Sequence, residues 1–163
     1  MSEKETIAYL AGIIDGEGFI EIRKVITSKG NFCYSARMSF FMTNKTPADL
    51  FSQIFGSKVL CTKMKRKEYY GIAVGGKNLK PILVKLLPYL RVRKQVALYA
   101  LELIKNRKEF PVHPIFENGK FRGTQEIPKK IQQKREHLFV LCSSYQKQRG
   151  QGIEDPEKFS KRE

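Results

Sequence analysis

The chain has 163 residues, and its 31 lysines and arginines against 16 aspartates and glutamates give a formal net charge of +15 at pH 7. This length favours one domain over residues 1–163, and 41% hydrophobic with 11% aromatic residues argues against a disordered chain. No stretch reaches the roughly 18 apolar residues of a membrane span, and the acidic amino-terminal segment does not resemble a secretory signal. Cys33, Cys61 and Cys142 lack a paired spacing, which favours a reducing, intracellular compartment.

The positive charge is concentrated in the middle of the chain. Residues 1–21 carry a net charge of −4, residues 22–101 of +14 and residues 102–163 of +5. A basic field of this size attracts polyanions, above all nucleic acid. A ribosomal protein, or one that is simply well solvated, would have the same charge, so charge alone does not name the partner.

The first predicted element is a helix over about residues 3–15. Ser2 and Glu5 have the spacing of a capping box, and the apolar residues that follow repeat with helical spacing. Gly16 and Gly18 end the helix. From Phe19 the apolar residues alternate with period two, which predicts a strand, a turn at residues 28–31 and a second strand over about residues 33–42.

The same order of helix and hairpin then recurs. Thr46 as N-cap, Pro47 and Gly56 bracket a second helix. A second hairpin follows, with strands at about 60–65 and 69–74 and a turn at 66–68. Two helices at about 78–87 and 92–105 come next, then a loop over 108–128 and a basic helix over 129–148. The fold class is therefore α+β, in the order αββαββα, with the core at about 5–105 and a carboxyl-terminal loop and helix over 106–163.

A four-stranded antiparallel sheet with helices on one face leaves its other face open. We expect basic and polar side chains to line this open face, and a curved ribbon of this kind fits the major groove of DNA. A strand of about eight residues spans about 26 Å, or about eight base pairs, so one chain would cover half a site. Tyr69 could stack on bases or belong to the core. The candidate DNA-binding residues are Glu21, Arg23, Lys29, Ser35, Arg37, Ser39, Cys61, Lys63, Lys65 and Tyr69.

Small residues follow one side of the first helix. Ala8, Gly12 and Gly16 are spaced four residues apart, which permits close approach to a second copy of the helix or to an internal partner. Asp15 and Glu17 lie at the carboxyl end of this helix, where the helix dipole disfavours anions. A bound cation would relieve that cost.

The segment from Leu10 to Gly18, LAGIIDGEG, resembles the LAGLIDADG signature of homing endonucleases, and the αββαββα order matches over about residues 5–105. A single copy of the motif resembles the small homodimeric members of the family. The resemblance implies a site-specific, metal-dependent double-strand DNA endonuclease that acts as a homodimer on a pseudopalindromic site of roughly 20 base pairs. It implies a dimer interface that includes Ala8, Leu10, Ala11, Gly12 and Asp15, with Asp15 mainly structural and capping the opposing helix.

The resemblance also implies the active-site residues. Glu17 takes the position of the metal-binding acid, and the carbonyl of Gly16 joins it. The implied cofactor is Mg²⁺, with Mn²⁺ or Ca²⁺ able to replace it in binding. Asn44 is the candidate for ordering active-site water. Arg93 or Lys94 takes the place of the family's lysine, and because arginine stays charged, Arg93 would stabilise phosphate and would not move a proton.

Other functions have weaker support. His113, His137 and the cysteines lack zinc-ligand spacing, and neither a membrane partner nor a small-molecule substrate is indicated. A non-cleaving nucleic-acid binder, such as an RNA maturase that assists intron splicing, is the alternative, and a ribosome-associated structural protein is a remoter one. The Met start and the absence of a flanking splicing domain favour an intron reading frame over an intein.

Overall fold

The computed structural model describes residues 2–26, 32–64 and 66–150. Four strands form one antiparallel sheet in the order β1-β2-β4-β3, and a separate hairpin joins β5 to β6. The predicted α+β class and the αββαββα order are confirmed. The elements are α1 (Glu3–Gly16), β1 (Phe19–Ile26), β2 (Phe32–Met42), α2 (Thr46–Phe55), β3 (Leu60–Met64), β4 (Lys67–Gly75), a 3₁₀ turn (Gly76–Asn78), α3 (Leu79–Leu86), α4 (Lys94–Glu109), β5 (Pro114–Glu117), β6 (Lys120–Thr124) and α5 (Lys129–Gly150).

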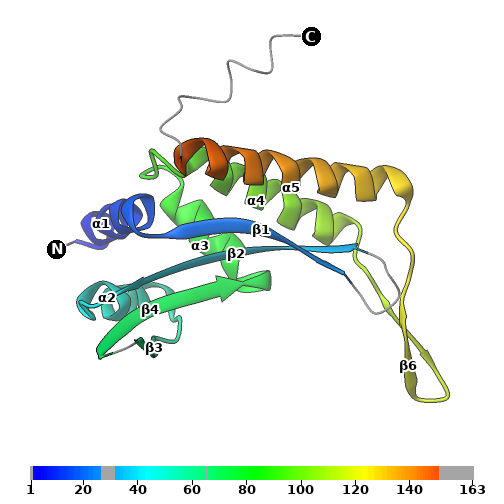
Figure 1. Cartoon of the computed structure of the whole chain (residues 1–163), viewed down its shortest axis with the longest axis horizontal. Coiled ribbons are helices and arrows are strands. Elements are labelled where there is room, and N and C mark those ends of the chain that lie inside the picture. The colour runs from blue at the N-terminus through cyan, green and yellow to red at the C-terminus, as the bar shows by residue number, and fades with distance from the viewer. Residues whose placement is uncertain (1, 27–31, 65, 151–163) are drawn as a thin grey trace, which may run out of the picture.

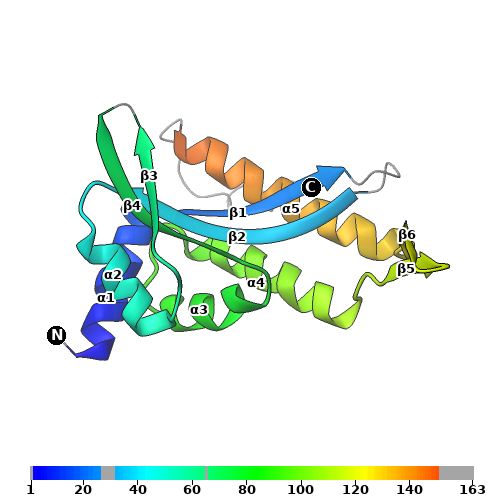
Figure 2. The same cartoon turned by 90° about the horizontal axis from the view of Figure 1, so that it is seen from below.

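The sheet is curved, and the helices are arranged on its convex side. Figure 2 shows α1 to α4 below the strands, with the concave side facing away from them. Alternate residues of the strands, among them Ile20, Met38 and Ile72, are fully buried against the helices. No helix among the described residues has the length and apolarity to cross a membrane.

The ends of α1 and α2 follow local sequence rules. The backbone N–H of Ser2 donates to Glu5 Oε2 at 2.7 Å and that of Glu5 donates to Ser2 Oγ at 3.3 Å, so the predicted capping box is confirmed. Gly56 ends α2 with φ of 65°, as predicted. The predicted N-cap at Thr46 is wrong, because Lys45 holds that position and the Thr46 N–H donates to Asn44 Oδ1.

Several element bounds differ from the prediction. Residues 67 and 68 belong to β4 and not to a turn, and a 3₁₀ turn precedes α3. The segment predicted as a loop over 108–128 contains the β5–β6 hairpin, whose turn residues Asn118 and Gly119 have φ of 51° and 73°. Figure 1 shows this hairpin beyond the ends of β1 and β2. The predicted turn at 28–31 lies outside the described residues.

Helix α5 runs beside β1, one of the two edge strands of the sheet (Figure 1). The side-chain amides of Gln146 and Gln132 donate to the carbonyls of Ile20 and Phe32 at 2.6 and 2.9 Å. A contact between Glu136 and the side chains of Lys24 and Tyr34 ties the middle of α5 to β1 and β2. The edge of β1 is thereby covered.

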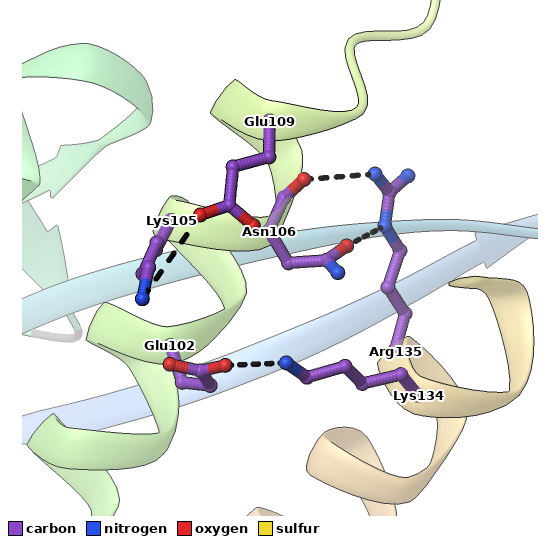
Figure 3. A network of polar contacts seen from close by, with 6 residues as sticks. All are labelled: Glu102, Lys105, Asn106, Glu109, Lys134 and Arg135. Carbon is purple, nitrogen blue, oxygen red and sulfur yellow. Dashed lines mark hydrogen bonds and ion pairs between the residues drawn. The ribbon is translucent and has the colours of Figure 1, made fainter.

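On its other side α5 packs on α4 through a polar network (Figure 3). The buried Arg135 guanidinium donates to Asn106 Oδ1 at 2.7 Å and to the Phe110 carbonyl at 2.7 Å. Lys134 forms an ion pair with Glu102 at 2.5 Å, which holds the pKa of the Glu102 carboxyl below its usual value. These contacts fix a helix that lies outside the part of the chain carrying the motif.

Candidate functional site

The carboxyl end of α1 is joined to the loop before α4 by a reciprocal set of hydrogen bonds. Oδ2 of Asp15 accepts from the backbone N–H groups of Arg91 and Val92 at 2.7 and 3.1 Å, and Oδ1 accepts from that of Arg93 at 2.8 Å. In return, Arg93 Nε donates to the Ile14 carbonyl at 2.7 Å. The guanidinium thus places positive charge at the negative end of the α1 dipole.

This geometry corrects the prediction for Asp15. The residue is only 9% exposed, and its carboxylate binds backbone groups of its own chain. Asp15 is therefore structural, as expected, but it caps the loop before α4 of the same chain and has little surface for an opposing helix. It fixes α1 relative to the loop that carries Arg93.

Glu17 lies just past the last turn of α1, with an exposed side chain. Its backbone N–H donates to the Ile13 carbonyl at 2.8 Å, so the position of its Cα is set by the helix. Gly18 must be glycine, because an added Cβ would lie 2.6 Å from Ile14 Cα. The chain can therefore turn tightly at this point, and β1 begins two residues after Glu17.

The other predicted active-site residues lie near the same end of the sheet. Asn44 follows β2 at the end where β1 begins, as the pairing of Phe19 with Ser39 requires. Its Oδ1 is occupied by the Thr46 N–H at 3.0 Å. Lys94 is the exposed first residue of α4. The catalytic roles of these residues stay predictions.

The concave side of the sheet has the predicted polar residues in its middle rows. The register pairs Glu21 with Arg37, Arg23 with Ser35 and Phe19 with Ser39, all with side chains on the face away from the buried Ile20 and Ile22. We call this side the open face. Tyr69 shares it, since β4 residues 69, 71, 73 and 75 alternate with the buried Ile72 and Val74. Lys29 and Lys65 lie outside the described residues.

The prediction is wrong for Cys61 and Lys63. They pair with Tyr70 and Glu68, and this pairing puts them on the same side of the pleat as Ile72, opposite to the open face. The error is a shift by one residue in the assumed facing of β3. On that side Tyr70 donates its hydroxyl to Glu68 at 2.6 Å, which raises the pKa of Tyr70.

Sequence reasoning missed the aromatic side chains of the open face. Phe41 stands opposite Gly71, and a Cβ at Gly71 would lie 1.9 Å from the Phe40 carbonyl oxygen and 2.8 Å from the Phe41 ring. Phe19 is 41% exposed. Neither residue was among the predicted DNA-binding residues, because Tyr69 was the only aromatic residue considered for this face.

The surface of α1 differs in part from the predicted interface. Leu10 and Ala11 have no exposed surface and pack in the core of their own chain, so they cannot form a dimer interface. The exposed side instead carries Gly12 and the large side chain of Tyr9. Tyr9 was missed because the predicted interface was built around the small residues of the helix and the LAGIIDGEG segment, which begins at Leu10.

The donor atoms at the end of α1 fit a hard divalent cation that shares its coordination with other molecules. Glu17 supplies one carboxylate and Gly16 an exposed backbone position. No group of three His, Cys, Asp or Glu side chains that could hold a metal occurs among residues 2–26, 32–64 and 66–150. Mg²⁺ commonly takes one or two carboxylates together with waters and phosphate oxygens, so one chain would offer only part of its ligands.

Comparisons with known proteins concern the sequence and the fold of this chain. No family model matches the chain. It is 32% identical over 102 residues to DNA endonuclease I-CvuI of Chlorella vulgaris, which covers 60% of this chain and 63% of that protein. The chain thus spans less than two thirds of the length of this relative.

Solved structures show the same fold. The homing endonuclease I-CvuI in complex with its target superposes with a TM-score of 0.65 at 19% identity, over 87% of this chain and 82% of that one. The I-SmaMI LAGLIDADG homing endonuclease bound to cleaved DNA gives a TM-score of 0.56 at 15% identity, over 83% of this chain and 41% of that one. The resemblance expected from the sequence is confirmed: the chain is related in sequence to a homing endonuclease and has the fold of the LAGLIDADG homing endonucleases.

Proposed function

We propose that this chain is a site-specific homing endonuclease that makes a divalent-cation-dependent double-strand break in a pseudopalindromic DNA site of roughly 20 base pairs, acting as a homodimer. The observation that carries this proposal is the position of Glu17. The acid lies exposed at the end of α1, two residues before the strand that opens the basic and aromatic face of the sheet.

The open face binds the major groove. Arg23 and Arg37 can donate to guanine O6 and N7 or to phosphates, and Ser35 and Ser39 can bond either partner. The curvature of the sheet (Figure 2) lets successive rows of side chains follow the groove. Each chain reads one half-site.

The exposed side of α1 forms the dimer contact. A Cβ added at Gly12 or Gly16 would meet nothing within 4 Å in the described part of the chain, so contacts inside the chain do not require glycine there. A second α1 can approach closely over these positions and Ala8. Tyr9, which is 42% exposed, adds apolar area to the contact. The two Glu17 side chains then meet over the duplex.

Two Glu17 carboxylates, two Gly16 carbonyls and the DNA phosphates would hold the divalent cations. When bound, Mg²⁺ supplies the charge that activates water and stabilises the leaving 3′ oxygen. Ca²⁺ or Mn²⁺ can take its place in binding. Arg93 positions the end of α1 through Ile14 and keeps a fixed positive charge near the acids. Lys94 contacts phosphate, and Asn44 orders water.

The proposal is tested with the Glu17→Gln variant and duplexes selected from a library of inverted repeats, each arm randomised over about eight base pairs. With Ca²⁺, the variant should bind the selected duplexes within about twofold of the wild type. With Mg²⁺, its rate of double-strand cleavage should fall at least about a thousandfold, because several kcal/mol of charge stabilisation are lost.

The matched control is Glu102→Gln, which removes the same charge from the contact between α4 and α5. This variant should cleave at the wild-type rate. Sedimentation of the wild type on its duplex should show two copies of the 18.9 kDa chain. Undiminished cleavage by Glu17→Gln, or a single chain bound per duplex, would refute the proposal.

A further inference from the structure

The open face contains one acidic side chain among the described residues that the register places on it. This residue is Glu21, and it stands directly across from Arg37. A carboxylate on a surface that binds phosphates weakens that binding by repulsion. Its position beside an arginine therefore needs a reason other than general affinity.

The surroundings of Arg37 leave room beside its side chain. Arg37 is paired on its other side with Gly75, and the neighbouring β4 residue on this face is Ala73, so β4 contributes no long side chain here. The result is a hollow of about 210 Å³ lined by Arg23, Ser35, Arg37, Ala73, Gly75 and Gly76. A base edge can enter this hollow beside Arg37.

Glu21 is also held in place from within its own strand. Arg23 Nε lies 3.5 Å from Glu21 Oε1, and the two side chains are 53% and 24% exposed. An exposed ion pair of this kind adds at most about 1 kcal/mol to stability. The contact orients the carboxylate but does not bury it, and its second oxygen can still accept hydrogen bonds.

We propose that Glu21 and Arg37 together read one C·G base pair in each half-site, an inference that rests on the proposed function. Glu21 accepts from the N4 amino group of cytosine, and Arg37 donates to O6 and N7 of the paired guanine. Directly opposed residues on antiparallel strands have Cβ atoms about 5 Å apart. That separation suits two side chains that address the two bases of one pair in a groove about 12 Å wide.

An A·T pair fits the same two side chains less well. It offers the carboxylate a donor at adenine N6, but its two acceptors, adenine N7 and thymine O4, lie on different bases. Arg37 therefore cannot bind them as it binds the two acceptors of guanine. The Glu21 carboxylate, which only accepts hydrogen bonds, and the Arg37 guanidinium, which donates two parallel ones, together select C·G.

The test uses the full chain with Ca²⁺ and the library of inverted repeats, and sequences the bound duplexes. The wild type should show a C·G preference at one symmetric position of each arm. In Glu21→Gln this preference should fall by about tenfold, with a shift toward adenine, which is the base that glutamine binds best. Other positions should change by less than about twofold. Arg37→Gln should relax the same position, and Glu102→Gln should leave the whole profile unchanged.

Three outcomes overturn the inference. Glu21→Gln could raise binding uniformly over all sequences, which would reduce Glu21 to a source of charge. Glu21→Gln could change the preference only at the base-pair position that Arg23→Gln also changes, while Arg37→Gln changes a different base-pair position. That result would mean that Glu21 acts through Arg23. Finally, the wild type could select no duplex at all, which would refute the proposed function as well. The first two outcomes leave that function standing.

Discussion

Replacement of Asp15 by asparagine should destabilise the chain, because three backbone N–H groups share the carboxylate. Hydrogen bonds to a charged acceptor contribute about 1.5–3 kcal/mol each. The amide oxygen of asparagine can keep the bonds from Arg91 and Val92. Its NH₂ group then faces the N–H of Arg93, which in the wild type donates to Oδ1 of Asp15 at 2.8 Å. One bond is lost and two are weakened, so we expect a loss of about 2–3 kcal/mol.

Equilibrium unfolding in urea, followed by far-ultraviolet circular dichroism, measures this loss. The protomer concentration must be fixed, because the proposed dimer would add to the measured stability. For a chain of this size the melting temperature should fall by roughly 5–10 °C. The matched control is Glu109→Gln, which removes an exposed charge 4.0 Å from Lys105 and should change stability by less than about 0.5 kcal/mol. An Asp15→Asn variant as stable as this control would contradict the role assigned to the carboxylate.

Two further changes test the sheet and its contact with α5. Gly71→Ala should lower the urea midpoint by an amount equivalent to about 1–3 kcal/mol of unfolding free energy. The new Cβ would lie 1.9 Å from the Phe40 carbonyl oxygen, so the two strands would have to separate. An unchanged midpoint would rule out this packing. The bonds from Lys24 and Tyr34 hold the pKa of Glu136 below its usual value of 4.5. Because the folded pKa is the lower one, this contribution to stability is present above about pH 5 and is lost as the pH falls through the folded value. As the pH is lowered through this range, the free energy of unfolding should therefore fall less steeply in Glu136→Gln than in the wild type. Identical dependences of the unfolding free energy on pH in the two proteins would exclude the contact.

Most of the fold was predictable because its signals are local. The capping box at Ser2 and Glu5, the left-handed Gly56 and the change of period at Phe19 each depend on a few neighbouring residues. The β5–β6 hairpin was missed although Asn118-Gly119 is a strong turn signal. The prolines around it favoured an irregular loop, and the flanking strands are too short for alternation to stand out.

The site was predictable only where a motif or an alternation fixed it. The motif pointed to Glu17, which the structure places exposed at the end of α1, and alternation along β1 and β2 indicated the polar side of the open face. The facing of β3 could not be predicted, because its register is set by pairing with β4 and all but its first residue are exposed. The hydrogen bonds of Asp15 join residues 76 to 78 positions apart, which no local pattern reveals.

The position of α5 limits how far the chain can be shortened in an engineered version of the protein. Its glutamines bind one carbonyl of β1, that of Ile20, and one at the start of β2, that of Phe32. A fragment trimmed to the motif-bearing first two thirds would therefore expose an uncovered strand edge. An exposed edge strand can pair with strands of other molecules, which leads to aggregation. A tandem fusion of two copies for use as a monomeric reagent would therefore need to retain this helix in both halves.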